Sequence, residues 1–490
     1  MNRTIADAGW RFDNSYARLP EPFFVRATPT PVRAPALVVL NGPLATELGL
    51  DPEILRDKGA AVFAGNELPP GATPIAQAYA GHQFGYFTNL GDGRAILVGE
   101  QLTPDSRRFD IQLKGSGRTA YSRSGDGRAA LGPMLREHIV SEGMHALGIP
   151  TTRSLAVATT GEQVLRAVPL PGAILTRVAA SHIRVGTFQY AAALADRSLL
   201  TALLDYAIAR HDPERAAADD PAAAFLEAVV ERQATLVARW MLVGFVHGVM
   251  NTDNVVVSGE TIDYGPCAFL DTYDPTTAFS SIDQQGRYAY ASQPAITHWN
   301  LARLAESLLP LVRGGEEAAL DRVRGVLGTF PTRFERHRLA GARAKLGLAS
   351  EEDGDGELFA TLLVRMQETR ADFTATFASL ARCAEAATPA EEVCATPAFR
   401  EWCTSWRARL ARQPGTIAEA AARMRRVNPV VIPRNHRVEE ALAAAESGDL
   451  SVCHRLLAVL GSPFVETAEN EPYRSGPPAG CGPYRTFCGT

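Results

Sequence analysis

The sequence contains no run of eighteen or more uncharged apolar residues, so it predicts no membrane-spanning helix. The stretch that comes closest, Leu236–Met250, carries Arg239 and His247 and is typical of a helix buried in a protein core. The first residues, MNRTIADAGWRFDNS, contain no apolar segment like that of a secretory signal peptide. These absences predict a cytoplasmic protein that does not enter a membrane.

Cysteine is also scarce, with seven residues in a chain of 490. There is no CxxC pair and no Cys/His cluster at the spacing of a zinc site. A framework of disulfides is therefore not expected. Four of the cysteines (Cys383, Cys394, Cys403 and Cys453) lie in sequence of helical character, where free cysteine behaves as a small hydrophobic residue. We expect these four to be buried thiols.

Neither sign of charge dominates the chain. The net charge is −5, and charged residues make up 21% of the sequence, which gives no reason to expect nucleic acid as a partner. Hydrophobic residues make up 46%, as in ordinary globular proteins, and 490 residues are enough for two or more structural units. The chain shows no internal repeats, and no pattern in it predicts an oligomeric state.

The most informative motif lies at residues 247–265. In HGVMNTDN, His247 and Asn254 stand in the register of the protein-kinase catalytic loop H-R-D-L-x-x-x-N, but Val249 occupies the place of the kinase base. The triplet DYG, beginning at Asp263, stands where a kinase has Asp-Phe-Gly. In kinases the loop Asn and this second Asp hold the Mg²⁺ ions that bridge the nucleotide phosphates. The motif predicts a nucleotide site with its metal ligands preserved and its chemistry altered.

Each half of this motif alone is also compatible with a simple turn, because Asp and Asn side chains bond readily to nearby backbone. Two neighbouring segments favour the kinase-like interpretation. The β-branched run Val255–Val257 is expected to form a short hairpin between the two halves. The preceding segment, Phe225–Phe245, has apolar residues at helical spacing, as in the long buried helix that leads into a kinase catalytic loop.

A lysine suited to nucleotide phosphates lies upstream. Apolar and polar residues alternate through Phe109–Lys114, which predicts a strand that ends at Lys114, before a Gly-Ser-Gly turn. A helix is expected over residues 129–147, and it offers Glu137 and Glu142 as acidic partners of the lysine. Glu137 is preferred because it lies two turns into the helix. A lysine on a strand is otherwise typical of a solvated sheet edge.

A glycine-rich segment precedes the lysine strand. Strands are expected at Gln83–Asn89 and Ala95–Gly99, with Gly91-Asp92-Gly93-Arg94 between them, and Asp-Gly is a strong hairpin signal. Glycines also let backbone N–H groups approach a phosphate, to which Arg94 can add a charge-assisted bond. A plain hairpin is the alternative. Together, the glycine segment, lysine strand, acidic helix and metal loop follow the order of a kinase N-lobe.

Longer stretches carry a specific resemblance. The segments GHQFGYFTNLGDGRAILVGE, DIQLKGSGRTAYSRSGDGRAALGPMLREHIVSEGMHALGIPTTRSLAV, HGVMNTDN and DYGP are similar to the selenoprotein O family, as are RYAYASQPAITHWNLARLAESL and the terminal FCGT. The resemblance extends over nearly the whole chain. It implies an α+β, protein-kinase-like two-lobed fold with a mixed β/α N-lobe and a larger, mostly helical C-lobe. It also implies a protein adenylyltransferase that binds ATP in a flipped orientation and transfers AMP to Ser, Thr or Tyr hydroxyls of proteins.

The resemblance also implies roles for particular residues. Asp253 matches the catalytic base, and Asn254 and Asp263 match ligands of Mg²⁺ or Mn²⁺. The implied ATP-binding positions are Gly91, Gly93, Arg94, Lys114, Asp126, Gly127, Arg177, Arg184 and Asp263. A flipped nucleotide places its β- and γ-phosphates deep in the pocket, where Arg177 and Arg184 would add positive charge to that of Lys114. Without the resemblance, this pair is equally typical of surface arginines on a hinge.

Cys488, in the terminal FCGT, matches a family position that holds selenocysteine or cysteine and is linked to redox control. Cys267 is the nearest partner by sequence, and Cys481 is an alternative. Some family members place the partner further along, where this chain has Phe279-Ser280-Ser281. A regulatory disulfide thus stays open at this point.

The expected organisation is an N-terminal extension that packs on the body (1–74), a kinase-like N-lobe (75–175), a helical C-lobe with the metal loop (176–473) and a C-terminal tail (474–490). Two other functions remain alternatives. One is a kinase-like phosphotransferase in which Asp253 substitutes for the missing base. The other is a non-catalytic nucleotide-binding scaffold, which the valine at position 249 favours.

Overall fold

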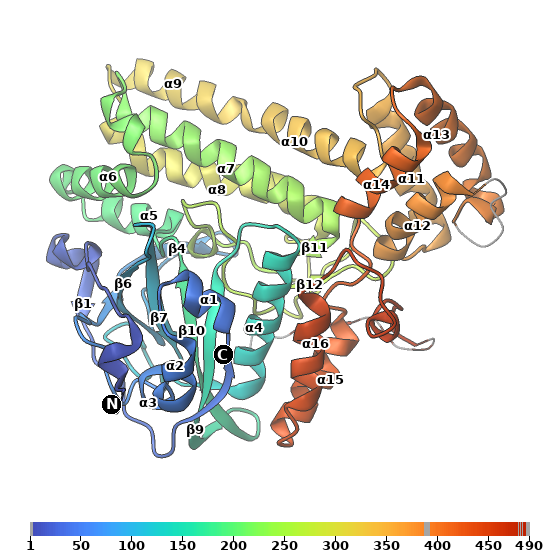
Figure 1. The fold of residues 1–490 in the computed structure, drawn as a ribbon. Helices are drawn as coiled ribbons and strands as arrows, with labels where there is room; N and C mark the ends of the chain where they lie inside the picture. Colours follow the sequence, from blue (N-terminus) through green and yellow to red (C-terminus); the bar gives the residue numbers. More distant parts are fainter. Residues whose placement is uncertain (1–2, 387–392, 479, 481, 483, 487–490) are drawn as a thin grey trace.

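The computed structural model describes residues 3–386, 393–478, 480, 482 and 484–486 (Figure 1). Within these residues, the N-terminal half is built around an antiparallel sheet of eight strands. The spatial order is β1 (Phe24–Arg26), β3 (Ile75–Gln77), β6 (Ala95–Leu102), β7 (Arg108–Lys114), β10 (Pro169–Ala179), β9 (Arg153–Leu165) and β2 (Ala36–Leu40), with the short β8 (Ala129–Ala130) paired to β10. Segments on both sides of residue 75 therefore share one sheet.

Helices cover both faces of this sheet (Figure 1). The short helices α1 (Gly42–Glu47), α2 (Pro52–Lys58) and α3 (Ala60–Phe63) bury Ile54 and Phe63 with Ile111 and Ile174 of the strands. On the other face, α4 (Leu131–Ala146) packs its apolar side on β9 and β10. Because α4 crosses the sheet beside the end of β7, it brings Glu137 to the lysine of that strand.

The C-terminal half is mostly helical. Its helices are α5 (Val185–Ala193), α6 (Arg197–His211), α7 (Pro221–Val243), α8 (Gln293–Leu308), α9 (Glu316–Gly328), α10 (Phe330–Lys345), α11 (Asp355–Thr369), α12 (Phe373–Glu385), α13 (Arg400–Arg412), α14 (Ile417–Val427), α15 (Asn435–Glu446) and α16 (Ser451–Leu460). The long helix α7 lies alongside α8 and α10 (Figure 1). The two-lobed, protein-kinase-like fold expected from the sequence is confirmed.

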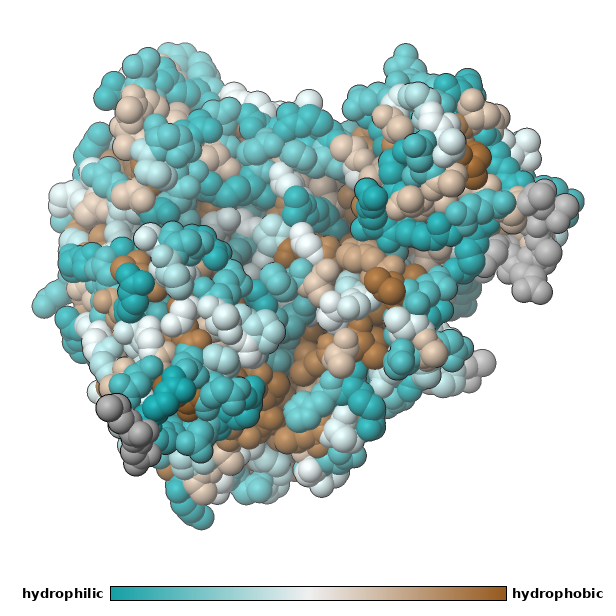
Figure 2. Space-filling model, viewed as in Figure 1, coloured by the Kyte–Doolittle hydropathy of each residue, from teal (hydrophilic) through white to brown (hydrophobic). Residues whose placement is uncertain are grey.

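The last helices return to the N-terminal half. Helices α15 and α16 pack on α4, and Val438, Leu442 and Leu456 join its core cluster. Seen from the same side in Figure 2, apolar residues gather around a hollow where α4 faces these two helices. Within the described residues, no helix is long and apolar enough to cross a membrane.

The glycine segment differs from the expected hairpin. Strand β5 (Tyr86–Asn89) pairs with β4 (Ala80–Gln83), whereas β6 pairs with β3 and β7. The tight turn is at Phe84-Gly85, whose φ angles of 50° and 92° are both left-handed. The prediction that Gln83–Asn89 and Ala95–Gly99 form one hairpin was therefore wrong. Residues 91–94 instead connect two sheets, and the buried side chain of Asp92 bonds to the backbone N–H of Gln77 at 3.0 Å.

Two smaller predictions were also wrong. The run Val255–Val257 forms no hairpin of its own, because Val256 bridges to Arg184 and the backbone of Val257 donates to Ile183. Cys394 and Cys403 are not buried thiols but form a disulfide across nine residues of sequence. Cys383 and Cys453 are buried, as expected.

Candidate active site

The catalytic-loop motif is held between two short strands. Helix α7 ends at Val243, with Gly244 in the left-handed conformation (φ 74°), and β11 (Phe245–Val246) then pairs with β12 (Ala268–Phe269). His247 is buried at the start of the loop, and its Nε2 lies 2.9 Å from the carbonyl oxygen of Ile262. This contact ties the two halves of the motif together. It brings the 3₁₀ turn Thr252–Asn254 and Asp263 into one site.

Two cations and two carboxylates meet at the centre of the site. Lys114 Nζ lies 2.6 Å from Glu137 Oε2 and 2.6 Å from Asp263 Oδ1. Arg177 Nη2 lies 2.5 Å from Glu137 Oε1 and 2.5 Å from the same oxygen of Asp263. Glu142 faces away and pairs with Arg153 at 2.7 Å. Of the two glutamates considered from the sequence, the one that contacts the lysine is Glu137.

The register of the sheet produces this cluster. In the pairing of β7 with β10, Lys114 stands opposite Leu175, and Arg177 lies two residues further along β10. Alternate residues of a strand point to the same face. The side chains of Lys114 and Arg177 therefore lie on neighbouring strands near α4, which supplies Glu137.

The buried cations control the ionisation of both acids. Although burial alone would raise the pKa of each carboxyl, Arg177 and Lys114 outweigh it and lower the pKa of Glu137. For the same reason they hold the pKa of Asp263 well below its usual range. The backbone of Asp263 is left-handed (φ 64°), a conformation that Asp tolerates better than most residues. Its side chain remains 26% exposed, so a ligand can reach it.

Asp253 lies in a different environment. It is partly buried, and within the described residues its Oδ1 has no hydrogen-bond partner. Burial raises its pKa to about 6. Gly81 makes room for it, since a Cβ there would stand 2.7 Å from Asp253 Oδ1. A carboxylate with this pKa is suited to accept a proton near neutral pH.

The neighbouring residues Asn254 and Asp263 fit a hard divalent cation. Asn254 donates from Nδ2 to the carbonyl of Val249 at 3.0 Å, so its amide oxygen is the atom that could coordinate a cation. Asp263 uses Oδ1 for Lys114 and Arg177 and keeps Oδ2. One amide and one carboxylate are typical of protein-bound Mg²⁺, whose other ligands are waters and substrate phosphates. No group of three or more His, Cys, Asp or Glu side chains at metal spacing occurs among the described residues.

Arg184 supplies a third deep cation. Its guanidinium lies 4.3 Å above the ring of Tyr79, and its Nη1 is 3.9 Å from Asp92 Oδ1. Within the described residues its Nε has no hydrogen-bond partner, so this buried group keeps a donor for a ligand. Tyr79 and Asp92 were not singled out from the sequence. The sequence pattern Gly-Asp-Gly did contain Asp92, but we interpreted that pattern as a turn.

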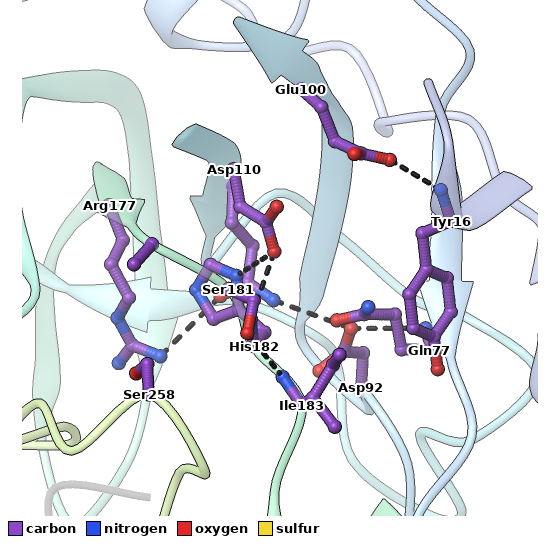
Figure 3. A network of polar contacts seen from close by, with 12 residues as sticks. Tyr16, Gln77, Asp92, Glu100, Asp110, Arg177, Ser181, His182, Ile183 and Ser258 are labelled. Carbon is purple, nitrogen blue, oxygen red and sulfur yellow. Dashed lines mark hydrogen bonds and ion pairs between the residues drawn. The ribbon is translucent and has the colours of Figure 1, made fainter. Parts of the chain in front are cut away.

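A network of polar contacts around Asp110 and His182 fixes the segment that leads to Arg184 (Figure 3). Asp110 accepts bonds from the backbone N–H of His182 at 2.9 Å and, at 3.0 Å, from its ring Nδ1. Arg210 of α6 binds Asp110 at 2.7 Å and Glu100 at 2.5 Å. The segment that carries Arg184 out of β10 is therefore fixed to β6, β7 and α6 together.

The remaining predicted ATP-binding positions lie in and beneath the loop 115–128. A Cβ on Gly91 would meet the ring of Tyr121 at 2.4 Å, and one on Gly93 would meet the Tyr121 carbonyl at 2.9 Å. Gly127 has φ 70° and packs on Gly117. Asp126 is 46% exposed and pairs with Arg166 at 2.8 Å, away from the lysine cluster. Close packing against Tyr121 and Gly117 is thus sufficient to explain glycine at positions 91, 93 and 127, and the contact of these residues and Asp126 with ATP stays a prediction.

A cavity of about 450 Å³ opens beside the lysine cluster. Arg94, Lys114 and Glu137 line its inner side, and Tyr484–Thr486 of the C-terminal tail line its outer side. Thr486 pairs with Ser280 and donates from Oγ1 to the carbonyl of Pro266 at 2.7 Å.

The tail residues therefore pack on the segment that follows DYG. Cys267 is a buried free thiol whose pKa burial raises to about 11. Cys481 and Cys488 lie outside the described residues.

Comparison with known proteins agrees with this geometry. The family model described as protein adenylyltransferase SelO matches residues 8–460. The chain is 61% identical to the protein nucleotidyltransferase YdiU of Geobacillus kaustophilus, over 99% of this chain and all of that protein. It is 57% identical to the YdiU of Syntrophotalea carbinolica and 58% identical to that of Rhizobium etli, in each case over the whole of this chain and 99% of the relative. The chain therefore belongs to the protein adenylyltransferase SelO family.

Proposed function

We propose that the protein transfers AMP from ATP to Ser, Thr or Tyr hydroxyls of other proteins, with the nucleotide bound in the flipped orientation. The observation that carries this proposal is the convergence of Lys114 and Arg177 on Asp263 Oδ1, at 2.6 and 2.5 Å, with Arg184 nearby. Adenine is uncharged and would not compensate three buried cations, whereas the anionic β- and γ-phosphates would. The family assignment supports the same reaction.

Asn254 and Asp263 are proposed to hold Mg²⁺ or Mn²⁺. When bound, the cation would neutralise negative charge on the phosphates of ATP. In this proposal Lys114 and Arg177 bind phosphate oxygens and give up part of their contact with Asp263. Glu137 continues to orient the side chains of Lys114 and Arg177. We assign Gly91, Gly93, Arg94, Asp126 and Gly127 to the remainder of the ATP site.

Asp253 is proposed as the general base. It accepts the proton of the acceptor hydroxyl, whose oxygen attacks the α-phosphorus of ATP. The bond between the α-phosphorus and the bridging oxygen to the β-phosphorus breaks, and pyrophosphate leaves with the electron pair. Most of the rate enhancement in such a reaction comes from positioning and charge stabilisation. In this proposal Arg177 and Arg184 stabilise the charge that develops on pyrophosphate.

A kinase-like phosphotransferase is the second candidate, favoured by the Lys114–Glu137 pair that kinases also use. Parallel reactions with α-labelled and γ-labelled ATP separate the two. AMP transfer places only the α label on protein, and phosphate transfer places only the γ label. Binding of ATP with neither label incorporated would instead support a nucleotide-binding scaffold.

We further propose that Cys488 forms a redox-controlled disulfide with Cys267, with Cys481 as the alternative partner. Alkylation followed by mass spectrometry of oxidised and reduced protein tests this, and unchanged labelling of Cys488 would refute it. Since the reaction consumes ATP, we expect it to take place in the cytoplasm.

A further inference from the structure

The β4–β5 hairpin exposes two aromatic side chains beside the proposed base. Tyr86 is 80% exposed and Phe87 is 47% exposed, both on β5. As neighbours on a strand, the two side chains point to opposite faces of the hairpin, so each face presents one exposed aromatic ring, as is typical of interaction surfaces. The position of this pair next to the reacting centre gives the exposure a functional meaning.

The hairpin is fixed directly to the catalytic loop. The backbone N–H of His82 donates to Thr252 Oγ1 at 2.7 Å, and that of Phe84 donates to Asn251 Oδ1 at 3.0 Å. Gly81 lies so close to Asp253 that a Cβ would overlap its carboxylate. The hairpin therefore forms one wall of the approach to Asp253, and a hydroxyl that reaches this carboxylate must pass it.

A cluster of aromatic and cationic side chains lies next to the hairpin. The ring of His82 contacts Phe87 and Trp299, with centroids 5.3 Å apart in both pairs. The guanidinium of Arg287 lies 5.1 Å over Trp299, and that of Arg303 lies 5.0 Å over the same ring. Arg303 pairs with Glu306 at 2.6 Å, but Arg287 makes no ion pair within the described residues. The Arg287 side chain thus lies near the hairpin without an ion pair, while the carboxylate of Asp283 accepts the backbone N–H of Arg287 at 2.9 Å.

The hairpin also offers a free strand edge. In the described part of the chain, β5 pairs with β4 alone. An exposed strand edge binds an extended peptide by adding it as a further strand, and the neighbouring side chains then select the peptide sequence.

We propose that this surface, formed by Tyr86, Phe87, Trp299 and Arg287, binds the acceptor segment of the substrate protein. The segment lies extended along β5, with one apolar residue against Phe87, a neighbouring residue on the opposite face against Tyr86, and an acidic residue facing Arg287. This inference rests on the proposed function, because it is the transfer reaction that requires a hydroxyl-bearing segment at Asp253. It adds the chemistry by which that segment is recognised.

The test uses α-labelled ATP and a library of short synthetic peptides. Each peptide has a central Ser, Thr or Tyr, and all other positions are varied. The full-length protein should label peptides that combine an apolar residue with an acidic one. In the double variant Tyr86→Ser, Phe87→Ser, we expect kcat/KM for these peptides to fall about tenfold or more, as is usual for aromatic anchors. ATP affinity, measured by calorimetry, should not change. Arg287→Glu should remove the preference for acidic residues.

The matched control replaces two apolar residues of similar exposure far from the site, Val364→Ser with Val465→Ser, which are 50% and 56% exposed. It should label peptides as the parent protein does. Normal labelling by the hairpin variant, with an unchanged peptide preference in Arg287→Glu, would overturn this inference and leave the proposed function intact. Absence of label from the parent protein itself on peptides and proteins alike would overturn both.

Discussion

At the scale of single residues, the site is a set of buried charges that compensate one another before any nucleotide binds. Lys114 and Arg177 carry two positive charges, and Glu137 and Asp263 carry two negative ones. Each cation lies 2.5 or 2.6 Å, nitrogen to oxygen, from both carboxylates. Within the described residues Asp253 forms no ion pair, and burial raises its pKa to about 6, although Arg184 partly opposes this rise. This contrast separates the groups that bind charge from the group that moves a proton.

The first prediction concerns the substitution Asp253→Asn. The amide has nearly the same shape but cannot accept a proton, so AMP transfer should fall by about 10²–10⁴-fold, the usual contribution of a general base. Since burying an amide costs less than burying a charge, the thermal midpoint should not decrease. Label transfer from α-labelled ATP and calorimetric unfolding measure the two effects. Transfer at the parent rate would remove Asp253 from the mechanism.

A second prediction concerns Glu260, whose carboxyl accepts the backbone N–H of Ala180 at 3.0 Å. Burial raises its pKa from 4.5 to about 7. The folded state thus keeps a proton that the unfolded chain loses, so the contribution to stability is complete below about pH 4.5 and is lost as the pH rises through 7.

The variant Glu260→Gln keeps the acceptor and does not titrate. It should therefore stabilise the protein by about 1–3 kcal/mol near pH 8 and by much less near pH 4. Urea unfolding at both pH values measures the difference. An equal effect at both would show that Glu260 is ionised in the same way in the folded and unfolded chains.

At the scale of elements, regular periodicity was a reliable guide. The strand expected at 109–114 is β7 at Arg108–Lys114, the helix expected at 129–147 is α4 at Leu131–Ala146, and the helix expected from residue 225 is α7. The glycine segment was mispredicted because the turn uses Phe84-Gly85, and Phe rarely adopts a left-handed φ. The pairing of Lys114 with Arg177 could not be predicted from either segment, because it depends on the register of two strands distant in sequence.

The third prediction follows from the contact of β4 with the catalytic loop. In Gly81→Ala the new Cβ would stand 2.7 Å from Asp253 Oδ1 and 3.2 Å from its Cβ, so the hairpin or the carboxylate must shift. A displacement of this order at a reacting group costs about 10²-fold in rate. Gly325→Ala is the matched control, since a Cβ there meets nothing within 4 Å in α9, where alanine favours the helix. Equal transfer rates in the two variants would contradict the proposed role of the hairpin.

At the scale of the whole molecule, Arg210 connects the two lobes. It lies on α6 of the helical lobe and binds Glu100 of β6 at 2.5 Å and Asp110 of β7 at 2.7 Å. It also donates to the carbonyl of Ala180 at 2.6 Å, in the segment that links the lobes. The side chains of all three charged residues are almost fully buried, so this guanidinium is one of the polar contacts that fix the relative position of the lobes.

The fourth prediction is that Arg210→Met destabilises the fold by about 3–5 kcal/mol, because it removes the closest cation from two buried carboxylates. Arg210 lowers the pKa of both Glu100 and Asp110 against the effect of burial, so its removal raises both values. Protonation relieves the cost, and the loss of stability should therefore be larger near pH 8 than near pH 5. Chemical unfolding at the two pH values measures this dependence.

A triple variant separates lost charge compensation from lost packing. Adding Glu100→Gln and Asp110→Asn to Arg210→Met removes the unpaired charges, so most of the stability should return, and the pH dependence should disappear. Recovery of stability without recovery of AMP transfer would then mean that the ion pairs also set the lobe arrangement in which Arg184 meets the nucleotide. A triple variant no more stable than Arg210→Met would contradict the electrostatic account, because packing of the Arg210 side chain would then be what joins the lobes.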